Sequence, residues 1–233
     1  MELNTGDNIN SKNSNWVFDE KVAEHFDEHV SKSVPGYYFM QVLAEAFSDW
    51  FTYPNCTVID FGASTGETLR RLKWRHSKPL NLIGYDNSPA MIEMAKKKGV
   101  DVELCDLEKP FELPKHSYAI AICTLQFLRP ERRHELLRQI YRHLENRGAL
   151  FVVEKVLGST PQMQDIMQQL YWEKKATNGY TSEEIINKAK ALRGCLYAKT
   201  IEENEIEFHN VGFNYEIVFK EFQFCGWLLT SKL

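Results

Sequence analysis

Apolar residues recur along this chain with two different periods, and the two patterns alternate. Short apolar or β-branched runs are typical of buried parallel strands, whereas apolar residues three or four positions apart predict amphipathic helices. The expected strands cover residues 57–61, 80–85, 100–106, 118–123 and 149–154. The helices between them are expected to begin near 66, at Pro89 with Ser88 as the N-cap, and at 130. Repeated strand–helix units of this length predict an α/β, Rossmann-like fold with a parallel, right-handed, doubly wound sheet.

The first 52 residues precede the first expected strand. Residues 1–14 are rich in Asn, Ser and Asp, and this composition predicts disorder. Two helices are then expected, from about residue 16 and over about 38–51, because Pro and Gly interrupt the periodic pattern at 33–37. We expect residues 15–52 to form a helical lid that closes over a cofactor bound at the strand ends.

Past the fifth expected strand, the pattern predicts a helical insertion and then a hairpin. The insertion covers residues 158–200, contains two helical segments separated by 177–180, and is expected over the substrate side. After one more helix, two apolar runs at 215–219 and 224–229 predict an antiparallel hairpin at the sheet edge, which brings the sheet to seven strands. Residues 15–233 are therefore expected to form a single domain.

Two glycines follow the first expected strand in the pattern Gly-x-x-x-Gly, at Gly62 and Gly66. A glycine turn between a strand and a helix lets the backbone approach a ligand, although such turns also occur with no ligand. Asp86 ends the second expected strand, 20 residues beyond Gly66, where an acid would bind the two hydroxyls of a ribose. The turn lacks both the dinucleotide pattern Gly-x-Gly-x-x-Gly and the Gly-Lys-Ser/Thr of a phosphate-binding loop. A ligand with a ribose but no phosphate fits best, and we identify it as S-adenosylmethionine (SAM).

The ligand of an open α/β sheet lies outside the carboxyl ends of the strands. We therefore expect the glycine turn to meet the amino-acid part of SAM, Asp86 its ribose, and Asp106 and Leu107 its adenine. Asp106 is about as consistent with capping a turn, and Ser64 with capping a helix, while Ile122 is more typical of the core. The expected cofactor contacts from this pattern are Gly62, Ala63, Ser64, Gly66, Asp86, Asp106, Leu107 and Ile122.

Composition and charge narrow the function further. The net charge of −4 gives no drive toward nucleic acid, and no basic surface with interleaved aromatic residues is evident, so direct nucleic-acid binding is not expected. No apolar run reaches the roughly 18 residues of a membrane span, and the polar N-terminus is not a signal peptide. The five scattered cysteines lack metal-ligand spacing, which predicts free thiols, no metal and a cytoplasmic location.

Methyl transfer from a sulfonium depends mainly on aligning the nucleophile with the methyl–sulfur bond, so a catalytic base is not required. Glu154, His25, His116 and Tyr180 are candidate proton acceptors, but each is more typical of a surface or structural group. We assign no catalytic residue from the sequence.

From about Trp16 to Leu229 the chain resembles the carboxy-S-adenosyl-L-methionine (carboxy-SAM) synthases, which have the class I methyltransferase fold. The resemblance is carried by the strings Phe18-Asp19-Glu20-Lys21-Val22-Ala23-Glu24, Ser33-Val34-Pro35-Gly36-Tyr37, Asp86-Asn87-Ser88-Pro89-Ala90-Met91-Ile92-Glu93, Thr124-Leu125-Gln126-Phe127-Leu128 and Asn178-Gly179-Tyr180. It implies that Tyr37 and Asn87 join the cofactor contacts, that Tyr180 lies on the substrate side and that the protein is a homodimer. These relatives convert SAM and prephenate to carboxy-SAM, which is used to modify a tRNA wobble uridine.

The chain departs from the family at two positions that bear on activity. The family arginine that holds the extra carboxylate corresponds, without gaps, to Ala189, and the family asparagine before the Thr-Leu-Gln-Phe string corresponds to Ile122. Alanine cannot form a bidentate clamp on a carboxylate. Arg193 lies one helical turn beyond Ala189 on the same side of the helix, so we name it, with Tyr180, as a substrate-side residue; Lys188 and Lys190 are further substitutes.

Three functions follow in order of preference. The first is transfer of the SAM methyl group to a small-molecule acceptor, which the departures at Ala189 and Ile122 favour. The second is carboxy-SAM synthesis with a relocated cation, so that either SAM or carboxy-SAM is the bound cofactor. The third is a SAM-binding regulatory module without catalysis.

Overall fold

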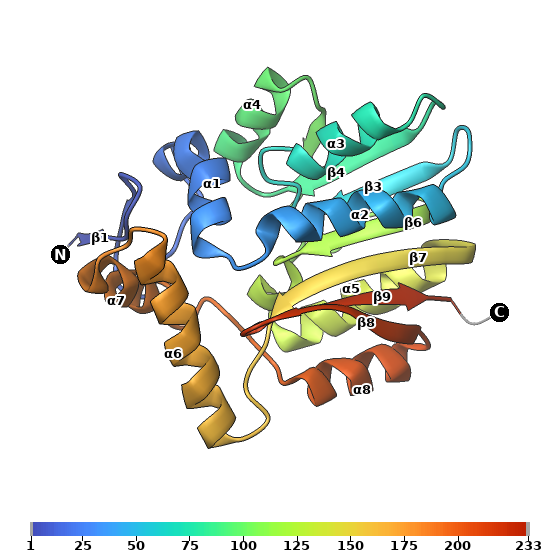
Figure 1. Ribbon diagram of the computed structural model, residues 1–233. Helices are drawn as coiled ribbons and strands as arrows, with labels where there is room; N and C mark the ends of the chain where they lie inside the picture. The colour runs from blue at the N-terminus through green and yellow to red at the C-terminus, as the bar shows by residue number, and fades with distance from the viewer. Residues whose placement is uncertain (1, 232–233) are drawn as a thin grey trace.

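The computed structural model describes residues 2–231, and its central element is a seven-stranded sheet with strand order β5-β4-β3-β6-β7-β9-β8 (Figure 1). The five strands from β5 to β7 pair in parallel, while β9 runs antiparallel to both β7 and β8. The strands of this sheet are β3 (Thr57–Phe61), β4 (Asn81–Asp86), β5 (Val102–Leu104), β6 (His116–Ile122), β7 (Leu144–Lys155), β8 (Asn214–Glu221) and β9 (Phe224–Thr230). The predicted doubly wound sheet with a C-terminal hairpin is confirmed.

Helices cover both faces of this sheet because its strands are apolar on both sides. Met40 and Ala44 of α2 pack on one face, and Leu136 and Ile140 of α5 pack on the other. Trp227, which has no exposed surface, extends the second core beneath the C-terminal hairpin. The α-helices are α1 (Glu20–Ser33), α2 (Tyr37–Phe51), α3 (Glu67–Arg75), α4 (Pro89–Lys97), α5 (Pro130–His143), α6 (Pro161–Thr177), α7 (Ser182–Ala191) and α8 (Ile201–Val211), and Leu125–Phe127 forms a short 3₁₀ helix.

Capping residues set where the helices begin. Ser88 accepts a hydrogen bond from the N–H of Met91, and Pro89 occupies the first turn of α4, as the sequence predicts. The first helix begins at Glu20 and not near residue 16, because the Asp19 side chain caps it by accepting from the N–H of Val22. Residues 16–18 have no regular secondary structure.

The prediction of a disordered N-terminus differs from the structure over residues 2–14; Met1 lies outside the described residues. The short strands β1 (Leu3–Asn4) and β2 (Asn10–Ser11) pair as an antiparallel hairpin that contacts α7. Ile9 is fully buried in a small core with Val22 and Met91. One apolar side chain in a polar segment gives no periodic signal, so composition alone does not reveal this contact.

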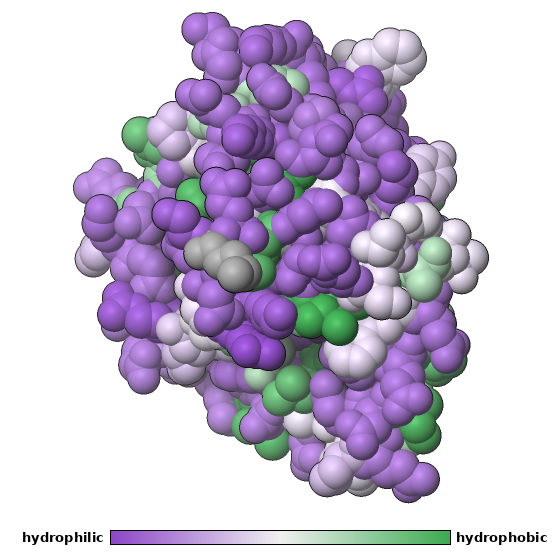
Figure 2. Space-filling model, turned by 90° about the vertical axis from the view of Figure 1, so that its left-hand side faces the viewer, coloured by the Kyte–Doolittle hydropathy of each residue, from purple (hydrophilic) through white to green (hydrophobic). Residues whose placement is uncertain are grey.

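Helices α6 and α7, the N-terminal hairpin and α1 lie together beyond one end of the sheet (Figure 1). That end carries the carboxyl ends of the parallel strands, so these segments form a cover over them. The face that contains the N-terminus is mostly hydrophilic, with a few hydrophobic side chains in its recesses (Figure 2). Across residues 2–231, no helix has both the length and the apolar character needed to cross a membrane.

Replacing Ile9 by Ala tests whether the hairpin belongs to the folded domain. Because the side chain is fully buried, we expect Ile9→Ala to lower the free energy of unfolding by about 2 kcal/mol or more, measured by urea denaturation. Lys12→Ala, at an exposed position of the same segment, is the control. Equal effects of the two substitutions would show that the hairpin does not pack on α1.

Candidate cofactor and substrate site

A cavity of about 390 Å³ lies at the carboxyl ends of β3, β4, β6 and β7. Side chains from α1, α6 and α7 line it from the other side, so the cover and the strand ends enclose it together. This is the place where open α/β sheets bind their ligands.

All but one of the residues expected to contact the cofactor line this cavity. The exception is Gly66, which is the N-cap of α3 and has a φ of 74°. It lies against Ala95 and Val100, where a Cβ atom would come within 3.1 and 3.2 Å. Gly66 therefore lets α3 pack closely on its neighbours. The residues that do line the cavity are Tyr37, Gly62, Ala63, Ser64, Asp86, Asn87, Asp106, Leu107 and Ile122.

The glycine turn is fixed by its own backbone. The N–H groups of Gly62 and Ala63 both donate to the carbonyl oxygen of Tyr85, at 2.8 and 3.0 Å. Gly62 has a φ of 72°, and a Cβ atom there would collide with the side chain of Thr124. Glycine is therefore required at this position both for conformation and for space.

Asp86 connects three segments of the cavity wall. Its carboxylate accepts hydrogen bonds from the N–H of Ser64 and the N–H of Ser88, each at 2.9 Å. Ser64 thus binds Asp86 through its backbone and does not cap α3, whose N-cap is Gly66. Burial raises the pKa of Asp86, while the backbone N–H donors oppose that rise. Each carboxylate oxygen retains a lone pair, which is free to accept from a ligand hydroxyl.

Asp106 caps a turn, one of its two expected roles, and it also lines the cavity. Its carboxylate accepts from the N–H of Glu108 at 3.1 Å and pairs with Lys109 at 3.1 Å. A carboxylate that is held in this way presents a fixed acceptor to a donor in the cavity.

Asp60, a buried acid in β3, is a site residue that was not predicted from the sequence. Asp60 lines the cavity, and its Oδ2 atom has no hydrogen-bond partner. Burial raises the pKa of Asp60 to about 8; the charge of Asp86 adds to this rise, and a hydrogen bond with Thr68 opposes it. The available signal is a single acid within the apolar run 57–61.

Three lysines form the other wall of the cavity, and two of them, Lys155 and Lys175, were not predicted from the sequence. Lys155 ends β7, Lys175 lies in α6 and Lys188 lies in α7, and all three line the cavity. Lys175 and Lys188 are 6% and 8% exposed, although the sequence pattern places them in amphipathic helices where lysine is normally solvated.

The two residues predicted for the substrate side do not line the cavity. Tyr180 donates a hydrogen bond to Asp7 of the N-terminal hairpin, so its hydroxyl holds the cover together. Arg193 and Ala189 share one side of the α7 segment, as predicted, but both are exposed on its outer surface. The inner side presents Lys188 and Leu192 instead, because the buried residues of α7 face the strand ends.

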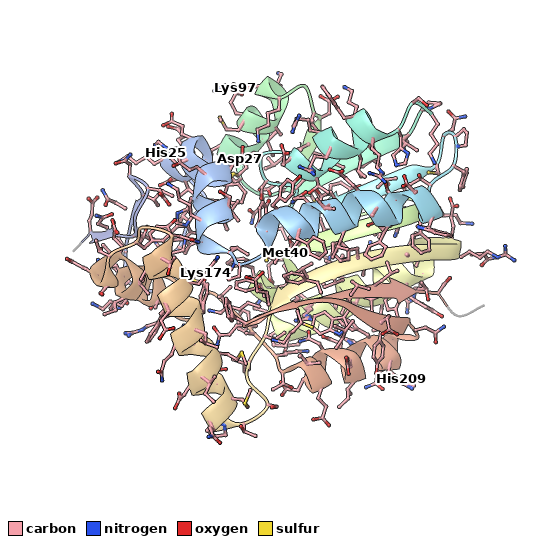
Figure 3. All side chains as sticks on the ribbon, in the orientation of Figure 1. His25, Asp27, Met40, Lys97, Lys174 and His209 are labelled. Carbon is pink, nitrogen blue, oxygen red and sulfur yellow. The ribbon has the colours of Figure 1, made fainter. Side chains whose placement is uncertain are left out.

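None of the candidate proton acceptors named from the sequence lines the cavity. His25 lies on α1 (Figure 3), and His116 begins β6, with its Nδ1 atom 2.9 Å from the carbonyl oxygen of Pro114. Glu154 is buried beside Arg133 and accepts from the N–H of Leu125 at 3.2 Å. The described residues contain no group of three or more His, Cys, Asp or Glu side chains able to hold a metal ion, and all five cysteines are free thiols.

Comparison with known proteins identifies the family. A family model described as "Methyltransferase domain" matches residues 58–148. The carboxy-SAM synthase of Staphylococcus epidermidis is 34% identical over 216 residues, which cover 91% of this chain and 95% of the relative. That of Methylococcus capsulatus is 36% identical over 219 residues, or 90% of each chain.

Solved structures agree on the fold. The plantazolicin methyltransferase BpumL, solved in complex with a triazolic desmethylPZN analog and S-adenosylhomocysteine (SAH), superposes with a TM-score of 0.65 at 16% identity, over 90% of both chains. A SAM-dependent methyltransferase of Thermotoga maritima gives 0.60 at 20% identity, over 91% of this chain and 97% of the other. The chain therefore belongs to the carboxy-SAM synthase family and is a SAM-dependent transferase with the class I methyltransferase fold.

Proposed function

We propose that this protein transfers the methyl group of SAM to a small-molecule acceptor. The observation that carries the proposal is the composition of the cavity wall: within residues 2–231, no arginine lines it. The position that corresponds to the family arginine is Ala189, on the outer surface of α7, and Ile122 replaces the family asparagine at the wall. The bidentate clamp on which carboxy-SAM binding rests in the family thus has no counterpart here.

The residues at the strand ends fit SAM. The two fixed carboxylates, Asp86 and Asp106, suit the ribose hydroxyls and the adenine amino group. The turn at 62–64 leaves room for the amino-acid part, and Tyr37 and Asn87 complete the set from either side. Asp60 lies beside this turn with one carboxyl oxygen that has no hydrogen-bond partner, and a positively charged ligand would favour its ionised form.

The residues of this chain position the two reactants and exclude water from the cavity. Bound SAM supplies a methyl group on a positively charged sulfur, and the methyl bond to sulfur breaks as the bond to the acceptor forms. The strand ends hold the cofactor side, while Phe26 of α1 and Trp16 and Phe18 of the segment before it line the cavity and exclude water from it. Fixing the two reactants in line supplies much of the rate, so this geometry needs no catalytic base.

Carboxy-SAM synthesis is the second candidate, because the relatives that bear this name match about nine-tenths of the chain. Prephenate and SAM would then be the substrates. Lysines of the cavity wall would have to replace the arginine clamp.

Mass spectrometry of the small molecule released from purified protein distinguishes the candidates. SAM or SAH alone supports methyl transfer, and the acceptor is then sought by turnover of SAM to SAH with candidate small molecules. Carboxy-SAM in the extract, or its formation from SAM and prephenate, would overturn the first proposal. SAM binding without turnover of any acceptor would support a regulatory module.

We further propose that the protein acts in the cytoplasm as a homodimer. Support comes from exposed apolar side chains on α6, namely Ile166, Leu170 and Trp172. Light scattering of the purified protein tests the dimer, and a monomer at all concentrations would refute it.

Asp86→Asn tests the ribose assignment. The substitution replaces one acceptor oxygen by a donor, so we expect SAH affinity to fall about 10-fold, or by about 1.4 kcal/mol, in a calorimetric titration. Asp101→Asn, at an exposed position between α4 and β5, is the control and should leave the affinity unchanged. Similar affinity in both variants would exclude Asp86 from the cofactor site.

Asp60→Asn tests whether this acid is protonated in the free protein. The unfolded chain releases the Asp60 proton near pH 3.8, whereas the folded protein holds it to about pH 8. The folded state therefore binds more protons between these values, and the contribution of Asp60 to stability falls as pH rises. We expect Asp60→Asn, relative to the parent protein, to gain more than about 1 kcal/mol of unfolding free energy between pH 5 and pH 8. Parallel stability curves from urea denaturation would contradict this.

A further inference from the structure

Residues 123–128, which follow β6, form one wall of the cofactor cavity. Every residue of this segment except Leu125 lines the cavity, and Leu125 is fully buried in the core. Phe127 also contacts the chain just before α1, because the centre of its ring lies 5.7 Å from that of Phe18. The position of the 123–128 segment therefore sets the shape of the cavity.

The 123–128 segment turns sharply and depends on contacts from outside it. Cys123 has a φ of 56°, in the left-handed region that residues other than glycine rarely adopt. Leu125 is the first residue of a 3₁₀ helix of three residues, so its N–H finds no acceptor within that helix. Such a backbone conformation persists only where the surrounding structure fixes it.

Glu154 of β7 supplies one of these contacts. One of its carboxylate oxygens accepts from the N–H of Leu125 at 3.2 Å, and the N–H of Gln126 also acts on this carboxylate. The side chain of Gln126 accepts in turn from the N–H of Lys155 at 2.6 Å. Strand β7 and the 123–128 segment are therefore joined by a side chain from each of them.

Arg133 of α5 holds Glu154 within the protein core. Both side chains are 1% exposed, and the nearest nitrogen and oxygen atoms of the pair are 3.7 Å apart. Arg133 also pairs with Glu207 of α8 at 3.1 Å, and Lys199 and His134 lie 2.8 and 3.7 Å from the same acid. Within residues 2–231, Glu154 thus has Arg133 as its one cation, whereas Glu207 has three basic partners.

Opposing influences act on the ionisation of Glu154. Burial raises its pKa to about 7; Arg133 and the two backbone N–H groups oppose this rise, and the charge of Glu207 adds to it. Cys123 and Cys225 face Glu154 as neutral thiols, because burial raises the pKa of both. An ionised carboxylate accepts a stronger hydrogen bond than a neutral one, so Glu154 holds the segment best when it is ionised.

We propose that Glu154, held by Arg133, is a positioning residue that fixes the 123–128 segment against the bound cofactor. This inference rests on the SAM binding of the proposed function, to which it adds a residue outside the cavity. Replacing a buried ion pair by apolar side chains of similar size is often neutral for stability, so stability alone does not account for this pair. Its contact with the segment gives it a role at the cofactor.

Calorimetric titration with SAH tests this role, and Glu207→Gln is the matched control for Glu154→Gln. Each substitution removes one buried acid from Arg133, but among the described residues only Glu154 also binds the N–H of Leu125. We expect both variants to unfold at lower urea concentration than the parent protein. Glu154→Gln should weaken SAH binding about 5-fold or more, whereas Glu207→Gln should stay within about 2-fold of the parent.

The backbone amide signal of Leu125, followed by NMR in protein labelled with ¹⁵N-leucine, reports the contact directly. We expect its chemical shift to titrate near pH 7 in the parent protein and to be independent of pH in this range in Glu154→Gln. In Glu207→Gln the titration should move to lower pH, because the charge that adds to the rise in the pKa of Glu154 is gone. Glu154→Asp keeps the charge but shortens the side chain, and it should weaken SAH binding in the same way if Glu154→Gln does not fold.

The outcomes separate a positioning role from a structural one. Equal loss of SAH affinity in Glu154→Gln and Glu207→Gln would indicate a general structural role and overturn the proposal. Unchanged SAH affinity in Glu154→Gln would also overturn it, as would a Leu125 signal that titrates alike in Glu154→Gln and the parent. Absence of SAH binding by the parent protein would overturn the cofactor assignment itself, whereas SAH binding with the expected contrast between the two variants supports the proposal whatever the acceptor.

Discussion

The carboxylate of Asp86 is the interaction on which the cavity floor depends. It joins the end of β4 to the glycine turn through the N–H of Ser64 and to the start of α4 through the N–H of Ser88. The glycine turn is also joined to β4 by the N–H of Gly62, which donates to the carbonyl oxygen of Tyr85 at 2.8 Å, but only Asp86 links the turn, the strand end and the helix start through one side chain. A buried carboxylate needs such donors to offset the loss of water, and the backbone donors need an acceptor for the same reason. The turn, the strand end and the helix start are therefore fixed together.

The cavity wall contains acidic and basic side chains that are buried, and burial disfavours their charged forms. Asp60 on one side and Lys175 on the other are both buried, and burial shifts the pKa of each toward its neutral form. Such groups reduce stability unless a partner of opposite charge is present. The large apolar cores on both faces of the sheet tolerate this cost. A ligand with positive and negative parts relieves it at both walls, which links binding to the stability of the domain.

Local signals in the sequence account for the sheet and much of the cofactor side. Three features depend only on residues that are close in sequence: the apolar strand runs, the capping of α4 by Ser88 and the spacing from Gly66 to Asp86. They can therefore be predicted without knowledge of the fold. The burial of Lys175, the outward direction of Arg193 and the packing of Ile9 depend on how α6, α7 and the hairpin dock on distant segments. No periodicity within those segments encodes that docking. Asp60 lies between these cases, because the sequence shows an acid in an apolar strand but does not show that its Oδ2 atom is left without a hydrogen-bond partner.

The cover over the strand ends comes largely from one inserted stretch, α6 and α7, whose contacts with the sheet are few compared with those between strands. The cofactor half of the cavity is encoded in the βα units, whereas the reactive half is encoded in this stretch and in the end of β7. Mutations in α6 and α7 can therefore accumulate without disturbing the hydrogen bonds of the sheet. Proteins with this architecture can therefore keep the same cofactor during evolution while their acceptor specificity changes through substitutions in a single peripheral segment.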